Sequence, residues 1–223
     1  MMSKELKIYY EDKDIIVVHK PAFVSSQGAR GSEIDMESMI RNHLYMTDKK
    51  ANPYVAVVHR LDKPVEGIMV YAKSKKAAAG LSTQIQSHSF KKSYVAVVGG
   101  NPDNKEYIRI ENYLVKDGAK NMSFVADKSH KEAKKAILEY KYIGENKDGY
   151  KVLKIKLHTG RHHQIRVTLS NLGYPIVGDS KYGDGAGAGK LMLCACEIEF
   201  KHPVSGKAMA FHCDINSDIY GVE

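Results

Sequence analysis

The sequence predicts an α+β fold built on a mainly antiparallel, mixed sheet that helices and loops flank. Short runs rich in β-branched and aromatic residues outnumber the clear helical patterns. Several of these runs are joined by connections short enough for hairpins, which pair neighbouring strands antiparallel. No repeat or linker interrupts the 223 residues, so we expect a single domain over residues 1–223.

The first 90 residues alternate strands with two helices. Expected strands cover residues 6–10, 15–19, 55–58 and 68–72. The second of them ends at Lys20-Pro21, because proline stops a strand. Met36, Met39, Ile40 and Leu44 have helical spacing, and Asp35 is suited to cap that helix. A second helix covers residues 74–86, with Ser74 as its N-cap.

The later part of the chain predicts more strands than helices. Expected strands cover residues 94–98, 107–114, 138–142, 153–157, 191–200 and 209–213. Residues 144–149 form a hairpin loop between two cleanly alternating strands. Residues 164–172 form a short helix that Gly173 and Pro175 end. The polar, lysine-rich residues 117–135 are expected to form a surface loop.

The charge balance favours an anionic partner. The chain has 34 Lys and Arg against 26 Asp and Glu, a net charge of +8. Nucleic acid is the most common partner of such a surface, and a cationic surface that only aids solubility is an equally good interpretation of charge alone. No apolar run is long enough to cross a membrane, and no signal-peptide core is present, so we expect a cytoplasmic protein.

Cysteine usage also indicates a reducing compartment. Of the three cysteines, Cys194 and Cys196 are too close together to brace a fold, and Cys213 leaves an odd count. Zinc sites usually show wider pairs, so we expect these cysteines to be buried small hydrophobes.

The first candidate site is His59-Arg60-Leu61-Asp62, in a turn between two apolar segments. Such a turn can hold a reactive side chain still and leave it open to a ligand. An isolated Asp in a turn is more often a cap or a salt-bridge partner than a catalyst. The turn alone therefore does not decide the function.

The second candidate site is Leu157-His158-Thr159-Gly160-Arg161-His162-His163-Gln164-Ile165-Arg166, where a strand turns into a helix. Its many donors suit phosphates or base edges, and a solvated basic turn is the alternative. Metal binding by His158, His162 and His163 is a further rival. We disfavour it because acidic ligands are absent nearby and the guanidinium groups would repel a cation.

Two further segments contain candidate functional residues. Tyr94 opens a strand after Lys92-Ser93, and its phenol could pack, stack on a base or carry a proton. The glycine-rich residues 183–190 look like a phosphate loop, but Leu191 stands where a Walker loop needs Ser or Thr after Lys190. We therefore expect a flexible loop there and no nucleotide-hydrolysing enzyme.

The motifs together resemble the RluA-like family of pseudouridine synthases over nearly the whole chain. They are His59-Arg60-Leu61-Asp62 with Gly67, Lys92-Ser93-Tyr94, residues 158–166 and Gly178-Asp179-Ser180-Lys181-Tyr182-Gly183, with Lys20-Pro21 and His202-Pro203 also fitting the pattern. Only the catalytic domain is expected, because the RNA-binding S4 domain that some relatives carry in front is absent.

The resemblance implies isomerisation of uridine to pseudouridine in structured RNA, either 23S ribosomal or transfer RNA, in a central RNA-binding cleft. Asp62 matches the essential aspartate, which can attack the sugar covalently or remove a proton from it. Arg166 matches the arginine that pairs with this aspartate, and Tyr94 matches the tyrosine that stacks on the base. Arg60 matches a residue that fills the space of the flipped nucleotide.

The resemblance also implies RNA contacts, for which we select His59, Arg60, Arg161, His163 and Gln164. No metal, organic cofactor or obligatory protein partner is expected, and the protein is expected to be a monomer. A catalytically silent RNA-binding protein and a metal-dependent RNA hydrolase are the alternatives.

Three departures from the family pattern bear on substrate choice. They are Val65-Glu66, Ala22-Phe23-Val24 and Cys194.

Overall fold

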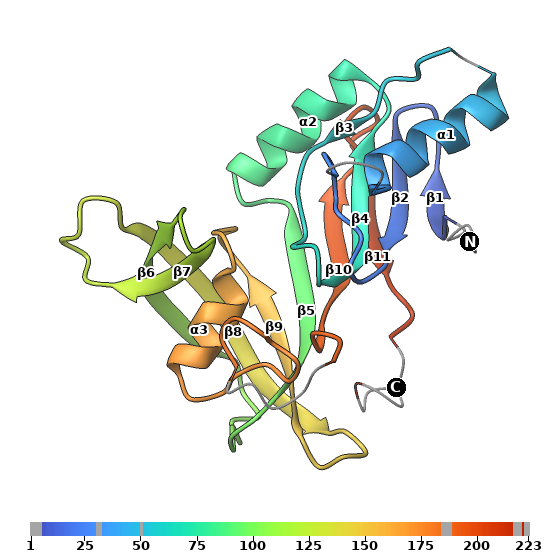
Figure 1. Cartoon of the computed structure of the whole chain (residues 1–223). Helices are drawn as coiled ribbons and strands as arrows, with labels where there is room; N and C mark the ends of the chain where they lie inside the picture. The colour runs from blue at the N-terminus through green and yellow to red at the C-terminus, as the bar shows by residue number, and fades with distance from the viewer. Residues whose placement is uncertain (1–5, 30–32, 50, 184–188, 216–219, 221–223) are drawn as a thin grey trace. The chain divides into compact units, whose positions relative to one another are not determined.

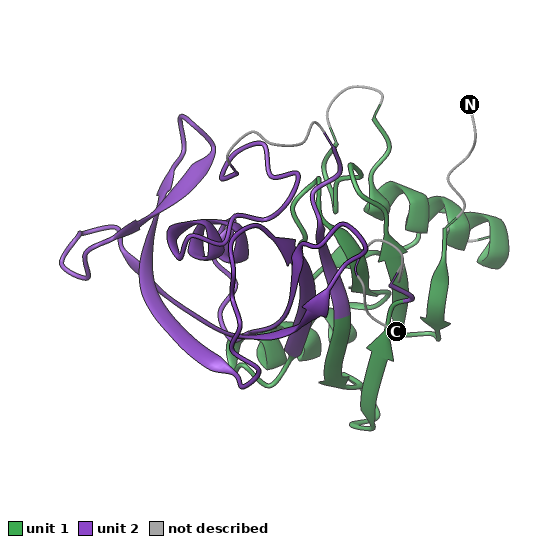
Figure 2. Ribbon diagram, turned by 90° about the horizontal axis from the view of Figure 1, so that it is seen from below, with its two compact units in different colours: residues 1–90, 197–213 green, residues 91–196, 214–223 purple. Residues whose placement is uncertain are grey.

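The computed structural model describes residues 6–29, 33–49, 51–183, 189–215 and 220, and these residues divide into two compact units (Figure 2). Unit 1 comprises residues 1–90 and 197–213, and unit 2 comprises residues 91–196 and 214–223. The chain passes from one unit to the other three times, once inside a strand. The expectation of a single domain therefore stays a prediction.

Unit 1 combines antiparallel strands with two helices (Figure 1). Its elements are β1 (Ile8–Glu11), β2 (Ile15–Lys20), α1 (Met36–Asp48), β3 (Ala56–Val57), β4 (Glu66–Ala72), α2 (Lys75–Gln86), the end of β10 (Leu193–Lys201) and β11 (Ala208–His212). Strand β2 lies antiparallel between β1 and β4, and β3 pairs with β4. Strand β11 pairs antiparallel with β10.

Both helices of unit 1 begin where their caps predict. The Asp35 carboxylate accepts the Ser38 N–H at 2.7 Å, and the Ser74 hydroxyl accepts the Ala77 N–H at 3.2 Å. The apolar positions of α1 are buried at Met36, Ile40 and Leu44, as their helical spacing predicts.

Unit 2 combines antiparallel strands with the short helix α3 (Figure 1). Its elements are β5 (Lys91–Val98), β6 (Ile108–Asp117), β7 (Met122–Ala126), β8 (Lys134–Glu145), β9 (Lys151–Leu157), α3 (Gln164–Asn171) and the start of β10. The strand order β5-β9-β8-β6-β7 is antiparallel throughout. Leu114, Ala136 and Val167 form a buried cluster that joins α3 to this sheet.

The prediction of a loop over residues 117–135 is wrong in part, because β7 pairs with β6 inside it. The hydrophobic alternation of this strand is inverted: polar Ser123 is buried, whereas Phe124 is 46% exposed. Its sequence therefore lacks the apolar face by which a half-buried strand is recognised. The prediction for residues 183–190 falls mostly on residues 184–188, which lie outside the described residues.

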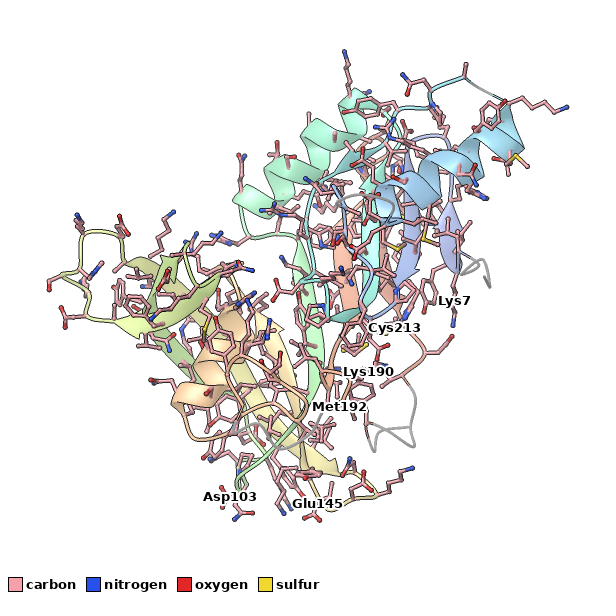
Figure 3. All side chains as sticks on the ribbon, in the orientation of Figure 1. Lys7, Asp103, Glu145, Lys190, Met192 and Cys213 are labelled. Carbon is pink, nitrogen blue, oxygen red and sulfur yellow. The ribbon has the colours of Figure 1, made fainter. Side chains whose placement is uncertain are left out.

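The predicted fold class is confirmed: the chain is α+β, and the strand pairs described above are antiparallel. A central RNA-binding cleft stays a prediction. All three cysteines are buried, as expected, including Cys213 directly after β11 (Figure 3). Among the described residues, no helix has both the length and the apolarity needed to cross a membrane.

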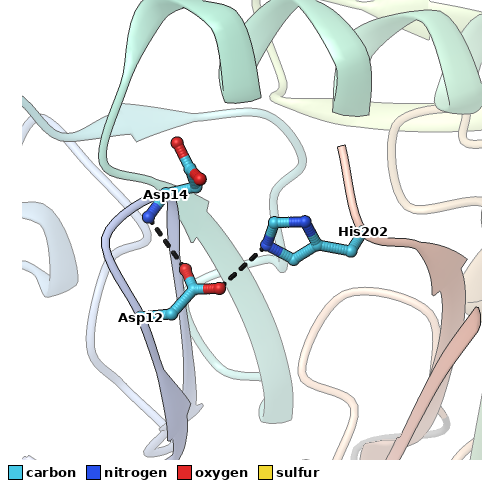
Figure 4. Close-up of side chains that lie close together, drawn as sticks. All are labelled: Asp12, Asp14 and His202. Carbon is cyan, nitrogen blue, oxygen red and sulfur yellow. Dashed lines mark hydrogen bonds and ion pairs between the residues drawn. The ribbon is translucent and has the colours of Figure 1, made fainter. Parts of the chain in front are cut away.

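A hydrogen-bonded cluster ties the β1–β2 turn to the β10–β11 turn within unit 1 (Figure 4). The Asp12 carboxylate accepts the N–H groups of Asp14 and Ile15, both at 2.8 Å, and the Tyr10 hydroxyl at 2.9 Å. It also accepts Nε2–H of His202 at 2.9 Å. Burial alone would raise the pKa of Asp12, but these hydrogen bonds and the nearby imidazole lower it below its usual value.

A lowered pKa in the folded state means that the Asp12 carboxylate stabilises the fold above its unfolded pKa, near 4. This contribution is lost as the pH falls through the lower folded value. We expect Asp12→Asn to lower the free energy of unfolding by about 1–2 kcal/mol at pH 7. The loss should shrink at pH 3, measured by urea denaturation at both pH values.

Asp127→Asn is the matched control, because the Asp127 carboxylate also accepts hydrogen bonds in its turn, from the Ser129 N–H and hydroxyl, but is fully exposed. Little change is expected at either pH. An Asp12→Asn loss of the same size at pH 3 and pH 7 would contradict the ionic interpretation.

Candidate active site

The Asp62 turn is a tight turn that leads into β4. The N–H of Val65 donates to the Asp62 carbonyl at 3.0 Å, which closes the turn over Lys63 and Pro64. The Asp62 side chain is half-buried, and the neighbouring Arg60 is exposed. The backbone thus holds the carboxylate in a defined place while one side of the segment faces solvent.

The buried ammonium group of Lys20 holds this turn in place through a hydrogen bond to its backbone. Lys20 is 0% exposed, although it is a lysine. Its Nζ donates to three carbonyl oxygens: Val24 at 2.6 Å, Pro21 at 3.0 Å and Lys63 at 3.1 Å. Burying a charge without hydrogen-bond partners costs free energy of folding. The ammonium group therefore keeps the three carbonyls in place around it. Lys20 therefore ties the residue next to Asp62 to the end of β2.

Ser26 holds the other side of Asp62. Its hydroxyl donates to the Leu61 carbonyl at 2.9 Å and accepts the Leu61 N–H at 3.1 Å, in the manner of a strand partner. The Tyr71 hydroxyl donates to the Ser26 carbonyl at 3.1 Å. Burial raises the pKa of Tyr71, with Asp35 and Glu37 adding to the effect, so this phenol stays a donor.

His59, selected as an RNA contact, has a structural partner in unit 1. It is 8% exposed, and its Nε2 accepts the Val70 N–H at 3.1 Å. Its ring lies 5.3 Å from that of Phe90. These contacts fix the start of the turn against β4, and a contact of His59 with RNA stays a prediction.

In unit 2, Gln164 shapes the loop between β9 and α3. Its Oε1 accepts the Thr159 hydroxyl at 2.9 Å and the Arg161 N–H at 3.0 Å, and its Nε2 donates to the Ile137 carbonyl at 3.0 Å. The side chain is 3% exposed. Arg161 is exposed, and its Nε donates to the Lys135 carbonyl at 2.9 Å.

Arg166 lies on α3 and is only 3% exposed. Its Nε and Nη2 donate to the two carboxylate oxygens of Asp179 at 2.7 and 2.6 Å, a bidentate pair. Burial alone would raise the pKa of Asp179, but Arg166 and the N–H groups of Lys181 and Tyr182 lower it below its usual value. The guanidinium group also lies over the Tyr182 ring, 5.2 Å from its centroid.

His163 precedes α3 in a left-handed backbone conformation, with φ of 53°. This conformation costs about 1 kcal/mol or more for a residue with a Cβ, so its surroundings must hold it. Burial lowers the pKa of His163 to about 3, and the charges of Arg166, His162 and Lys181 add to this effect. The imidazole is therefore neutral at physiological pH.

Tyr94, the third expected catalytic residue, lies in β5 and is 5% exposed. Its register partner on the neighbouring strand is Ile155 of β9. This pairing fixes the Tyr94 backbone, from which the phenol side chain extends. Asp62, His59 and Arg60 thus lie in unit 1, whereas Tyr94, Arg161, His163, Gln164 and Arg166 lie in unit 2. The convergence of Asp62 with Tyr94 and Arg166 stays a prediction.

One group of metal-type ligands meets among the described residues, namely Asp12, Asp14 and His202. Hydrogen bonds already engage it: Nε2 of His202 donates to Asp12, and Nδ1 accepts the N–H of Ser205 at 3.1 Å. His158, His162 and His163 form no such group in this part of the chain, and His158 instead pairs with Glu139 at 3.1 Å. The histidine-based metal site therefore finds no support in the geometry.

Sequence reasoning gave no role to several residues that hold these sites. Lys20, Ser26, Asp179 and Tyr182 fall into this class. Lys20 ends a strand that begins with the apolar run 15–18, and it precedes a proline, which is a weak sign of a buried lysine. The remaining partners lie too far away in the sequence for any local pattern to indicate them.

Comparison with curated proteins gives clear relatives. The chain is 30% identical to ribosomal large subunit pseudouridine synthase D of Zymomonas mobilis, over 96% of this chain and 70% of that protein. It is 29% identical to tRNA pseudouridine synthase C of Pectobacterium carotovorum, over 97% of this chain and 61% of that protein.

The fold has solved counterparts. Human RNA pseudouridylate synthase domain containing 4 superposes with a TM-score of 0.76 at 20% identity, over 94% of this chain and 88% of that one. The related human domain containing 1 gives 0.75 at 21% identity, over 95% and 84%. The family model described as RNA pseudouridylate synthase matches residues 14–171, which include Asp62, Tyr94 and Arg166. The chain therefore belongs to the RNA pseudouridylate synthase family.

Proposed function

We propose that this chain isomerises uridine to pseudouridine in structured ribosomal or transfer RNA, with Asp62 as the essential carboxylate. The observation that carries the proposal is the Asp62 turn, braced by a fully buried Lys20 within the stretch that matches the family model. Relatives named for ribosomal and for transfer RNA are similarly close, so both substrates are included.

The reaction exchanges one bond for another. The bond between N1 of uracil and C1′ of ribose breaks, and a bond between C5 and C1′ forms. The hydrogen on C5 leaves, and N1 gains a proton, so no oxidant or other reactant is needed. In the proposal Asp62 either attacks the sugar covalently or removes a proton from it.

Arg166 and Tyr94 complete the proposed chemistry. A guanidinium group keeps a nearby carboxylate ionised and oriented, and the bidentate Asp179 pair holds Arg166 rigid for this task. Tyr94 would stack on the base and relay a proton. A stacked uridine hides its glycosidic bond, so it must flip out at a cost of about a few kcal/mol. Arg60 would occupy the vacated space.

The excess positive charge supports the RNA partner. A net charge of +8 and exposed side chains such as Arg161 would attract phosphates. The proposal further includes a monomer without an obligatory protein partner, in the cytoplasm, the reducing compartment that the spacing of the cysteines favours.

Asp62→Asn should fold and bind RNA but make no pseudouridine. We expect the rate to fall by about a thousandfold or more, because the amide can neither attack the sugar nor take its proton. Pseudouridine formation is measured by carbodiimide-stop mapping, and RNA binding by filter retention. Asp148→Asn, an exposed carboxylate in the β8–β9 loop, is the control and should be unchanged. Persistent activity of Asp62→Asn would refute the proposed role.

RNA binding should weaken steeply with salt. Each neutralised phosphate contributes a slope of about −0.7 to −0.9 in a plot of log affinity against log salt. Titration of a structured RNA between about 50 and 300 mM salt measures it. A flat plot would remove the electrostatic part of the proposal.

Chelator treatment separates the synthase from the rival metal-dependent RNA hydrolase. We expect full activity after EDTA dialysis, assayed on an RNA whose fold is kept by monovalent salt, and an RNA product of unchanged length. Chelator-sensitive strand cleavage would favour the hydrolase instead.

A further inference from the structure

Residues 178–183 match a family motif, and the chemistry proposed above uses only Asp179 of this segment, as the partner of Arg166. Two of its side chains contact the charged and polar residues at the start of α3. Asp179 binds Arg166, and Tyr182 contacts both Arg166 and His163. The segment itself is anchored, because the Ser170 hydroxyl donates to the Tyr182 carbonyl at 2.7 Å. All of these residues belong to unit 2.

Two contacts constrain the Arg166 guanidinium. The bidentate pair with Asp179 fixes the plane of the group, since two parallel hydrogen bonds allow no rotation. The Cζ atom of Arg166 lies over the Tyr182 ring, 5.2 Å from its centroid. A shift of Arg166 would therefore require the whole segment to move.

The Tyr182 hydroxyl lies within hydrogen-bond distance of both Ser123 and His163. It accepts the Ser123 N–H at 2.6 Å, which leaves its own hydrogen for another partner. Nδ1 of His163 lies 2.9 Å away, and the hydroxyl can donate to this nitrogen or accept from it. With the hydroxyl as the donor, the neutral imidazole carries its proton on Nε2.

The surroundings of His163 disfavour its protonated state. His162 stacks on it with ring centroids 3.7 Å apart, and Arg166 and Lys181 add positive charge. Asp179 is the acidic group that faces it, and its oxygens are engaged by Arg166 and two backbone N–H groups. A protonated His163 would thus meet repulsion from three sides.

We propose that Tyr182, together with Asp179, is a positioning residue for the reaction: it holds Arg166 in one orientation and keeps His163 as a neutral Nε2–H hydrogen-bond donor. This inference rests on the proposed function, specifically on the role of Arg166. Misplacement of a catalytic group by about 1 Å can cost on the order of a hundredfold in rate, which gives the segment a measurable effect without substrate contact.

Histidine tautomers can be read directly, without activity, from two-bond ¹H–¹⁵N correlation spectra of the labelled protein. The His163 signals are assigned by their loss in His163→Gln. We expect the Nε2–H tautomer from pH 5 to pH 8, and a mixture of tautomers in Tyr182→Phe. A charged His163 at pH 6, an Nδ1–H tautomer, or an unchanged Tyr182→Phe spectrum would overturn the inference.

Kinetics test the positioning role. Tyr182→Phe removes only the hydroxyl, so we expect kcat to fall about 10- to 100-fold with KM unchanged. Tyr174→Phe is the matched control, because it deletes a hydroxyl from a tyrosine of the same unit that packs on Tyr140. Equal kcat values for the two variants, or a rise in KM alone, would overturn the inference. Asp179→Asn should lose more activity, and if it does not fold, Tyr182→Phe carries the test.

Arg166→Lys separates the two levels of the argument. Lysine keeps the charge but loses the bidentate geometry. An inactive Arg166→Lys beside a fully active Tyr182→Phe would sink the inference and leave the proposed function standing. A fully active Arg166→Lys would remove the role of Arg166, and the inference with it.

Discussion

The buried ammonium group of Lys20 is the constraint on which the Asp62 turn depends. A charge with no exposure is tolerable only if its hydrogen-bonding capacity is met, and three backbone carbonyls meet it here. One of these carbonyls belongs to Lys63, directly after Asp62. Lys20 therefore links three segments: the end of β2, the loop after it and the turn before β4. If one of them moved away, the buried ammonium group would lose a hydrogen bond.

Unit 2 also contains a buried cation, but there a carboxylate takes the place of the backbone carbonyls as its partner. There the buried cation is Arg166 itself, and the Asp179 carboxylate supplies its counter-charge in a bidentate pair. In both units, hydrogen bonds between buried polar groups hold an irregular segment in place. Such networks are demanding, because a single missing partner leaves a buried group unsatisfied.

The sequence predicted the elements whose signals are local. The caps Asp35 and Ser74 and the spacing of apolar residues located the start of each helix in unit 1 to within a residue, whereas α1 continues four residues beyond Leu44. Strand β7 was missed because its buried position is a serine and its exposed position a phenylalanine. The motifs indicated which residue types matter, but not their partners: Lys20 and Lys63 are 43 residues apart, and no periodicity links them.

The division of unit 1 between residues 1–90 and 197–213 has a consequence for biosynthesis. Asp12 pairs with His202, so the turn between β1 and β2 is completed by a segment that follows 190 residues later in the chain. At about 5–20 residues per second, residues 91–196, which separate the two parts of unit 1, take roughly 5–20 s to emerge from the ribosome. During that interval residues 1–90 lack the β10–β11 hairpin that completes unit 1, and the Asp12 carboxylate lacks its imidazole partner.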